Sequence, residues 1–248
     1  MAGVVKVFHS WRCVSDAVVA ALSEPTTDPF VRPILVAPGN AQSRSLLQSL
    51  ARRHGIAAGI DTTTPLGLRE RLEEDLLGVK RENDPWQPGS LALRICRVIE
   101  NNSPGFEVVS AHLEASRRQG VPRATWTTAR QAADAICALA RDSHDVLNAW
   151  ADGATPTTHQ GDTDLAGDPL DPARAWWAPL WRTLLAEPCH VPDPVSRHQL
   201  LVDAILTQSR SEPPIVWFSS TTTAQHDVSL AEALSASHDV TIVHLDHG

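Results

Sequence analysis

The turn at Val36–Ser45 is the part of the sequence best suited in position to phosphate chemistry, because a predicted strand precedes it and a predicted helix follows. It reads Val-Ala-Pro-Gly-Asn-Ala-Gln-Ser-Arg-Ser. A P-loop at such a turn needs several glycines, whose backbone N–H groups close on the phosphates, and a lysine that reaches the β- and γ-phosphates. This turn has one glycine and no lysine, and the planar fork of Arg44 does not replace a compact ammonium. We therefore expect no ATPase site in this chain.

The 11 histidines and 4 cysteines of the chain are its candidates for catalysis or metal binding. His244 and His247 lie three residues apart, and because residues at this spacing on a strand point to opposite faces, the pair is not suited to share a metal. The sequence contains no HExxH or GxSxG motif and no CxxC pair. A polar run follows a predicted strand, where α/β folds often place ligand loops: Ser219, Ser220 and Thr221–Thr223. A phosphate contact and an ordinary turn with a helix cap both remain open. We expect no catalytic residue and no metal site.

A tryptophan-rich segment is the most distinctive part of the second half of the sequence. At helical spacing it forms one apolar face, made of Trp177, Leu180, Trp181, Leu184 and Leu185. Such a face is typical of a buried core, but exposed aromatic rings can also stack on unpaired bases. Trp176 lies off this face and is the better candidate for contact with another molecule.

Composition and charge limit the classes of function. The chain has 248 residues and a net charge of −8, which argues against a surface that coats DNA everywhere, because such binding comes from Lys and Arg neutralising phosphates. Any DNA contact must be local or must depend on a partner. No run of about 18 apolar residues is present, and the N-terminus lacks the features of a signal peptide. We therefore expect a cytoplasmic protein that does not bind membranes.

Alternating strands and helices at both ends of the sequence predict an α/β layer with a parallel sheet. The predicted strands are Gly3–Phe8, Ile34–Val36, Ile56–Ile60, Ile215–Phe218 and Val240–Leu245. Ser10 is a candidate N-cap, and Thr64 followed by Pro65 indicates another helix start. This layer is assigned to residues 1–85 and 211–248.

Residues 86–210 show helical periodicity and are predicted to form an α-helical insertion in the layer. A capping box at Thr128–Gln131 predicts the start of one helix that continues through Ile136 to Trp150. Asp171-Pro172 and Asp193-Pro194 each indicate a further helix start. Residues 151–171 are rich in Asp, Gly, Thr and Pro, which predicts a flexible loop.

Several stretches, in the same order and at about the same positions, are similar to those of RecC proteins, the gamma subunits of exodeoxyribonuclease V. Val7–Arg12 is similar to the family's hydrophobic–aromatic–His-Ser-Asn-Arg start. Further matching stretches are Asp28–Phe30, Ile34–Val36, Gly55–Asp61, Ala132–Asp134 with Trp150, and Ala173–Trp181. The chain thus resembles the N-terminal portion of a RecC protein, and the family's longer chains imply a fragment or truncated form.

This resemblance implies a helicase-like, degenerate P-loop layer without ATPase motifs, in a subunit that guides and surveys single-stranded or forked DNA during double-strand break repair and recombination. It implies RecB-like and RecD-like partners in a heterotrimer, with ATP and Mg²⁺ bound by those partners and no cofactor in this chain. The DNA-binding positions that it suggests are Asn40, Gln42, Arg44, Asp134 and Arg197. The chain departs from the family at Ile136 and Cys137, where more polar residues are expected.

Two alternative functions remain open from the sequence. One is a small α/β nucleotide-dependent hydrolase or transferase, with a nonstandard site at the Pro38–Ser43 turn. The other is an adaptor that binds a protein partner through its tryptophan-rich face. Nucleotide binding distinguishes the first alternative, and salt-dependent binding of single-stranded DNA distinguishes the scaffold from the adaptor.

Overall fold

The computed structural model describes residues 4–24, 28, 30–101, 105–153, 176–207, 211–220 and 224–246. The chain divides into two compact units. Unit 1 combines Met1–Lys80 with Gln199–Gly248, and unit 2 is Arg81–His198. No helix among the described residues is both long and apolar enough to cross a bilayer.

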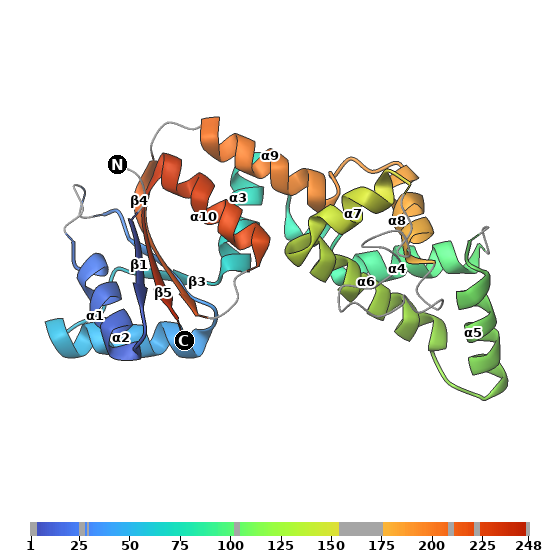
Figure 1. Ribbon diagram of the computed structural model, residues 1–248, viewed down its shortest axis with the longest axis horizontal. Helices are drawn as coiled ribbons and strands as arrows, with labels where there is room; N and C mark the ends of the chain where they lie inside the picture. The colour runs from blue at the N-terminus through green and yellow to red at the C-terminus, as the bar shows by residue number, and fades with distance from the viewer. Residues whose placement is uncertain are drawn as a thin grey trace. The chain divides into compact units, whose positions relative to one another are not determined.

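Unit 1 is built on a five-stranded sheet in which every pair of neighbouring strands is parallel (Figure 1). In spatial order the strands are β1 (Val4–Phe8), β5 (His238–Leu245), β4 (Ser211–Ser220), β2 (Ile34–Val36) and β3 (Asp61–Thr63). The helices of this unit are α1 (Trp11–Leu22), α2 (Asn40–His54), α3 (Pro65–Leu77) and α10 (Gln225–Ser237), together with the second half of α9 (Pro194–Thr207).

Each face of this sheet has its own hydrophobic core, because successive side chains of a strand point to opposite faces. Leu35 on β2 and Phe218 on β4 pack with α1 and α2 through Val18, Leu46 and others. On the other face, Trp217 of β4 packs with α3, α9 and α10. The central strands are therefore apolar on both faces, as expected for a parallel sheet covered by helices.

Side-chain caps define where two of these helices begin. The hydroxyl of Ser10 accepts a hydrogen bond from the backbone N–H of Cys13 at 3.3 Å, and the hydroxyl of Thr64 accepts one from Gly67 at 3.1 Å. Both caps satisfy backbone donors that have no partner within the helix. The two helix starts predicted from the sequence are confirmed.

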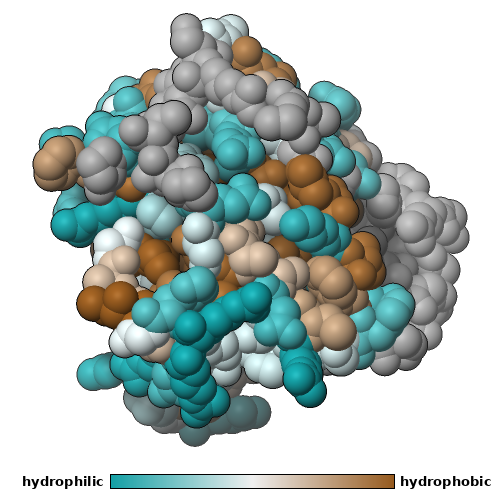
Figure 2. All heavy atoms as spheres, turned by 90° about the vertical axis from the view of Figure 1, so that its left-hand side faces the viewer, coloured by the Kyte–Doolittle hydropathy of each residue, from teal (hydrophilic) through white to brown (hydrophobic). Residues whose placement is uncertain are grey.

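The edge strand β1 exposes apolar side chains. Val4, Val5 and Val7 are 50%, 63% and 54% exposed, and among the described strands β1 pairs only with β5. Figure 2 faces the side on which α1 and α2 lie in Figure 1 and shows hydrophobic side chains gathered between hydrophilic ones. Lys6 is the charged residue in this strand, and charged residues on an edge hinder pairing with other chains.

In the residues that the structure describes, unit 2 contains helices and no strand. Its elements are the 3-10 helix η1 (Arg81–Asn83), α4 (Pro88–Glu100), α5 (Glu107–Arg118), α6 (Ala124–Asp142), α7 (His144–Ala151), α8 (Trp177–Ala186) and the start of α9. Its buried residues include Leu91, Ile95, Ile136, Leu147, Trp181 and Leu184. The apolar stripes of the sequence thus face a shared core.

The predicted third strand was misplaced. The strand is Asp61–Thr63, not Ile56–Ile60. Gly55 and Gly59 have positive φ angles of 80° and 73°, which an extended strand does not tolerate, and Ile56 is 68% exposed. Asp61 instead pairs with Ile34 of β2, so backbone pairing prevails over the weak strand preference of Asp.

The predicted helix from Thr128 to Trp150 is two helices. α6 begins four residues before Thr128, at Ala124, so the expected capping box lies inside the helix. The helix is interrupted at Ser143, whose backbone is not helical, and α7 follows.

Of the two further helix starts predicted from the sequence, the one at Asp193-Pro194 is confirmed. The carboxylate of Asp193 caps α9 by accepting from the N–H groups of Val195 and Ser196. Asp171-Pro172 and nearly all of the expected 151–171 loop lie outside the described residues.

Candidate nucleic-acid interface

The turn after β2 leads directly into α2 and carries three of the predicted DNA-binding residues. Asn40 and Arg44 are exposed, and their spacing of four residues puts them on one side of the helix. Gln42 is half-buried, and its amide oxygen lies 3.1 Å from where a Cβ on Gly39 would be. The side chain of Gln42 therefore folds over the turn, while the other two point to solvent.

The first turn of α2 has backbone donors available for a ligand. Gly39 is the N-cap and supplies no side-chain acceptor, so the helix begins without a capping side chain. Ser43 is buried, and its hydroxyl donates to the carbonyl oxygen of Gly39 at 3.0 Å. Free N–H groups at a helix start attract anions, although a P-loop would also need the missing lysine.

This turn lies where the order of the sheet reverses. The chain passes from β2 outward to β3, and from the adjacent β4 outward to β5 on the other side. Ligands of open parallel sheets bind at such a point, outside the carboxyl ends of the strands. At the same edge, Ser219 near the end of β4 shares a 2.9 Å hydrogen bond with Nδ1 of His244. His247 and Thr221–Thr223 lie outside the described residues.

Asp134, the fourth predicted residue, lies in α6 of unit 2. Nε of Arg130 donates to both carboxylate oxygens of Asp134, at 3.1 and 3.0 Å. The pair is about half exposed, with side-chain exposures of 45% and 53%, so solvent screens it. Asp134 therefore lies on the surface, where its carboxylate is partly neutralised by Arg130.

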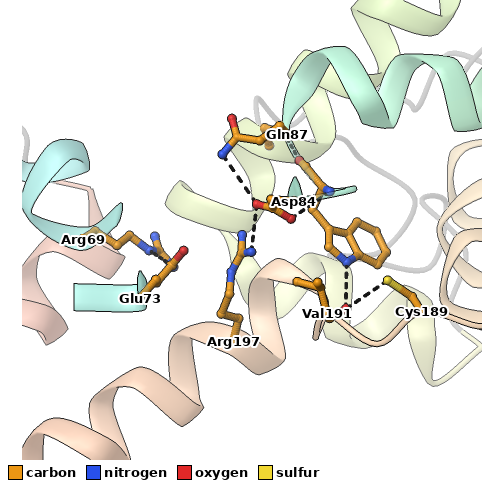
Figure 3. Close-up of polar contacts among 9 residues, drawn as sticks. Arg69, Glu73, Asp84, Gln87, Cys189, Val191 and Arg197 are labelled. Carbon is orange, nitrogen blue, oxygen red and sulfur yellow. Dashed lines mark hydrogen bonds and ion pairs between the residues drawn. The ribbon is translucent and has the colours of Figure 1, made fainter. Parts of the chain in front are cut away.

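Arg197, the fifth predicted residue, is buried in unit 2. Its guanidinium donates to Asp84 at 2.8 Å, and the side chains are only 8% and 2% exposed (Figure 3). Asp84 also accepts from the backbone N–H of Trp86 at 3.0 Å. Arg197 therefore binds Asp84 inside unit 2. This geometry does not support a contact between Arg197 and a DNA strand.

The indole N–H of Trp86 extends this buried arrangement. It donates to the carbonyl oxygen of Val191 at 3.2 Å. The same oxygen also accepts a hydrogen bond from the thiol of Cys189 (Figure 3). The guanidinium of Arg94 lies 4.4 Å from the centre of the Trp86 ring, a distance at which a cation is attracted to the ring face. Figure 3 also shows a separate ion pair within unit 1, in which Nε of Arg69 donates to Glu73 at 2.9 Å.

Cys137 lies among the charged groups of unit 2. Burial raises the pKa of its thiol to about 11, and the carboxylates of Asp134 and Asp84 add to the increase. Its S–H points to the carbonyl oxygen of Trp86 at 3.7 Å. A thiol with so high a pKa is neutral at physiological pH and is not a nucleophile. This residue therefore packs as a small apolar group.

The structure brings together some of the predicted residues and not others. Asn40, Gln42 and Arg44 share one helical turn of unit 1, whereas Asp134 and Arg197 belong to unit 2. Within the described part of the chain, no group of three or more His, Cys, Asp and Glu side chains is arranged to hold a metal ion.

The expectation that Trp176 faces outward was wrong. Trp176 is only 5% exposed, and its ring lies 6.2 Å from that of Phe106 and 6.4 Å from that of Trp177. It precedes the first residue of α8, so the helical face used for the prediction does not apply to it. Leu180, Trp181 and Leu184 are buried as a core stripe.

Sequence reasoning did not single out the hairpin of α5 and α6. Three arginines lie at its turn, Arg117, Arg118 and Arg123, and all three are exposed. Trp126, in the first turn of α6, is 39% exposed. The sequence signal was available, because residues 117–130 contain four arginines, one tryptophan and no acidic residue.

Comparisons with known proteins agree on one family. The chain matches the model described as RecC, N-terminal domain, across residues 8–246. It is similar to the RecBCD enzyme subunit RecC of two Mycobacterium tuberculosis strains, with 30% identity over 251 residues that cover 92% of this chain and 20% of the relative. The RecBCD enzyme subunit RecC of Mycolicibacterium smegmatis is 27% identical over 239 residues, which cover 92% of this chain and 19% of the relative. The chain thus spans about 20% of the length of these relatives.

Proposed function

The chain belongs to the RecC family, and from this membership we propose that it is a non-catalytic scaffold in a RecBCD-type helicase–nuclease, where it guides and surveys single-stranded DNA in break repair and recombination. The observation that carries this proposal is the family match, which includes both units. The sequence of the turn after β2 supports the non-catalytic part of the proposal, because it has no lysine to reach a triphosphate.

In this proposal the first turn of α2 contacts the DNA backbone. Asn40 and Arg44 are exposed on one side of α2, and Arg44 supplies a positive charge for a phosphate. Phosphate contacts of this kind fix the position of a strand without reading its sequence. Asp134 is a second proposed contact, because a surface carboxylate can accept a hydrogen bond from a base amino group.

Arg197 takes a different role in the proposal. Its contact with Asp84 is buried. If the guanidinium moved away to bind DNA, the carboxylate of Asp84 would remain inside the unit as a buried charge without its ion-pair partner. We therefore assign Arg197 to the stability of unit 2 and do not include it among the DNA contacts.

The proposed partners are RecB-like and RecD-like subunits, because the relatives are named as subunits of the RecBCD enzyme. ATP and Mg²⁺ would bind to these partners. The net charge of −8 weakens DNA binding by an isolated chain, so a shared DNA channel suits this chain better than binding alone.

Co-expression of the tagged chain with RecB-like and RecD-like proteins tests the assignment. Recovery of the three together, with ATPase activity only when the partners are present, is the expected result. Turnover of ATP by the chain alone that is lost in Gly39→Ala would favour a hydrolase at the Pro38–Ser43 turn. Capture of a partner without any binding of single-stranded DNA would favour the adaptor.

A further inference from the structure

The turn between α5 and α6 concentrates positive charge in a chain that is negative overall. We call Arg117, Arg118, Arg123 and Trp126 the hairpin tip; α5 and α6 are joined there by a short connection (Figure 1). No acidic residue lies between Arg117 and Arg130, although the chain carries a net charge of −8. The tip is therefore a local basic surface of the kind that an acidic chain needs for contact with phosphates.

The arginines of the tip are available to a ligand. Arg118 forms an ion pair with Glu114 at 3.0 Å, but the two side chains are 78% and 64% exposed, so the pair is weak. Arg117 contacts the hydroxyl of Thr125 at a long 3.4 Å. Within the described residues no hydrogen bond or ion pair holds the guanidinium of Arg123. Phosphate oxygens can therefore replace these contacts at little cost.

Trp126 adds an exposed aromatic ring to this basic surface. It is 39% exposed, whereas Trp86, Trp150 and Trp181 are at most 4% exposed. Trp11 is similarly exposed at 38%, but its ring packs edge-on against Phe218 at 5.5 Å. In the described part of the chain the ring of Trp126 has no aromatic neighbour. An exposed ring in the same turn of the chain as these arginines can stack on a base.

The backbone at this turn is held in an unfavourable conformation. Among the described residues, Arg123 is the one non-glycine residue with a positive φ, at 58°. A side chain in the left-handed region costs free energy, and such residues cluster at functional sites. Glycine would be relaxed at this position, yet the chain has an arginine there, directly before α6.

We propose that the hairpin tip binds single-stranded nucleic acid, with phosphates on Arg117, Arg118 and Arg123 and a base stacked on Trp126. This inference rests on the proposed function, in which the chain handles a single strand, and it adds a second contact to the one on α2. An acidic protein segment would use the arginines but would offer no flat base to Trp126, so the combination of residues favours nucleic acid.

Binding of a labelled oligothymidylate to the full chain, measured across a range of salt concentrations, tests the three arginines. We expect the triple variant R117A/R118A/R123G to bind more weakly and to reduce the slope of log K against log salt by about 2, at about 0.7 per phosphate contact. Glycine at position 123 also removes the backbone strain, so this variant should fold. The control R12A/R52A/R53A removes the same charge from exposed positions of unit 1 and should keep the slope.

The tryptophan is tested by comparing single-stranded and duplex probes. We expect Trp126→Ala to weaken single-strand binding by about 5- to 150-fold, because one stacked base is lost, and Trp126→Phe to recover part of it. Binding of a duplex of the same length should hardly change, since paired bases do not stack on a side chain. Equal weakening with both probes would overturn the stacking contact.

Different results would refute the hairpin tip alone and the proposed function as a whole. If the wild-type chain binds the oligonucleotide and both triple variants behave alike, the hairpin tip is refuted while the proposed function stands. If the wild-type chain does not bind at any salt concentration, both fail. Competition by polyglutamate as effective as that of an unlabelled strand would assign the tip to an acidic protein segment and overturn the inference.

Discussion

Arg197 donates to Asp84 at 2.8 Å although 113 residues separate them in the sequence. Asp84 lies between η1 and α4, at the beginning of unit 2, and Arg197 lies in α9, at the end of this unit. Their side chains are 2% and 8% exposed. The pair therefore joins the two ends of the helical unit inside its core.

Loss of this pair is expected to destabilise unit 2 strongly. Arg197→Met leaves the carboxylate of Asp84 buried without its partner and should lower the free energy of unfolding by about 3–5 kcal/mol. Arg130→Met, which breaks the exposed pair with Asp134, is the matched control and should cost no more than about 1 kcal/mol. Urea unfolding followed by circular dichroism measures both. Equal effects of the two substitutions would refute the structural role of Arg197.

The cysteines should differ sharply in reactivity. The pKa of Cys137 is raised to about 11, so at pH 8 only about 0.1% of it is the reactive thiolate. Burial also raises the pKa of Cys96, whereas Cys13 and Cys189 are exposed. Mass spectrometry after brief treatment with iodoacetamide should show modification at the two exposed cysteines first. Early modification of Cys137 in the folded chain would contradict this placement.

Stability should fall in mild acid because of His238. Burial lowers the pKa of this histidine below its ordinary value of 6.5, so the unfolded chain takes up a proton more readily than the folded one. The free energy of unfolding should therefore decrease as the pH falls from about 7 through 6.5 towards the lowered pKa. His238→Gln should reduce this dependence, whereas the exposed control His112→Gln should leave it unchanged. Identical pH profiles for the two variants would argue against the effect.

The sequence predicted the parallel α/β layer because its central strands are short apolar runs followed by turn residues. Leu35 and Phe218 are buried, as these runs indicated. The strand Asp61–Thr63 escaped prediction because Asp and Thr carry no apolar signal, and its place is set by backbone pairing with β2. Whether the layer is helicase-like stays a prediction.

The candidate site could be predicted only where local spacing determines it. The positions of Asn40 and Arg44 follow from helical geometry and the turn before them. The burial of Arg197 could not be predicted, because its partner Asp84 is distant in the sequence and no local pattern reveals the pair. Trp126 was overlooked because a single tryptophan in a helix usually belongs to the core, and only its exposure in the fold distinguishes it.

We propose that this chain holds a single strand of DNA through phosphate contacts and without a nucleotide of its own. Measuring the affinity of the full chain for a single-stranded oligonucleotide at several salt concentrations, with and without ATP and Mg²⁺, tests it directly. We expect a steep loss of affinity as salt rises and the same curve when ATP is added with Mg²⁺ held constant. A salt-independent affinity, or a curve that ATP shifts, would contradict it.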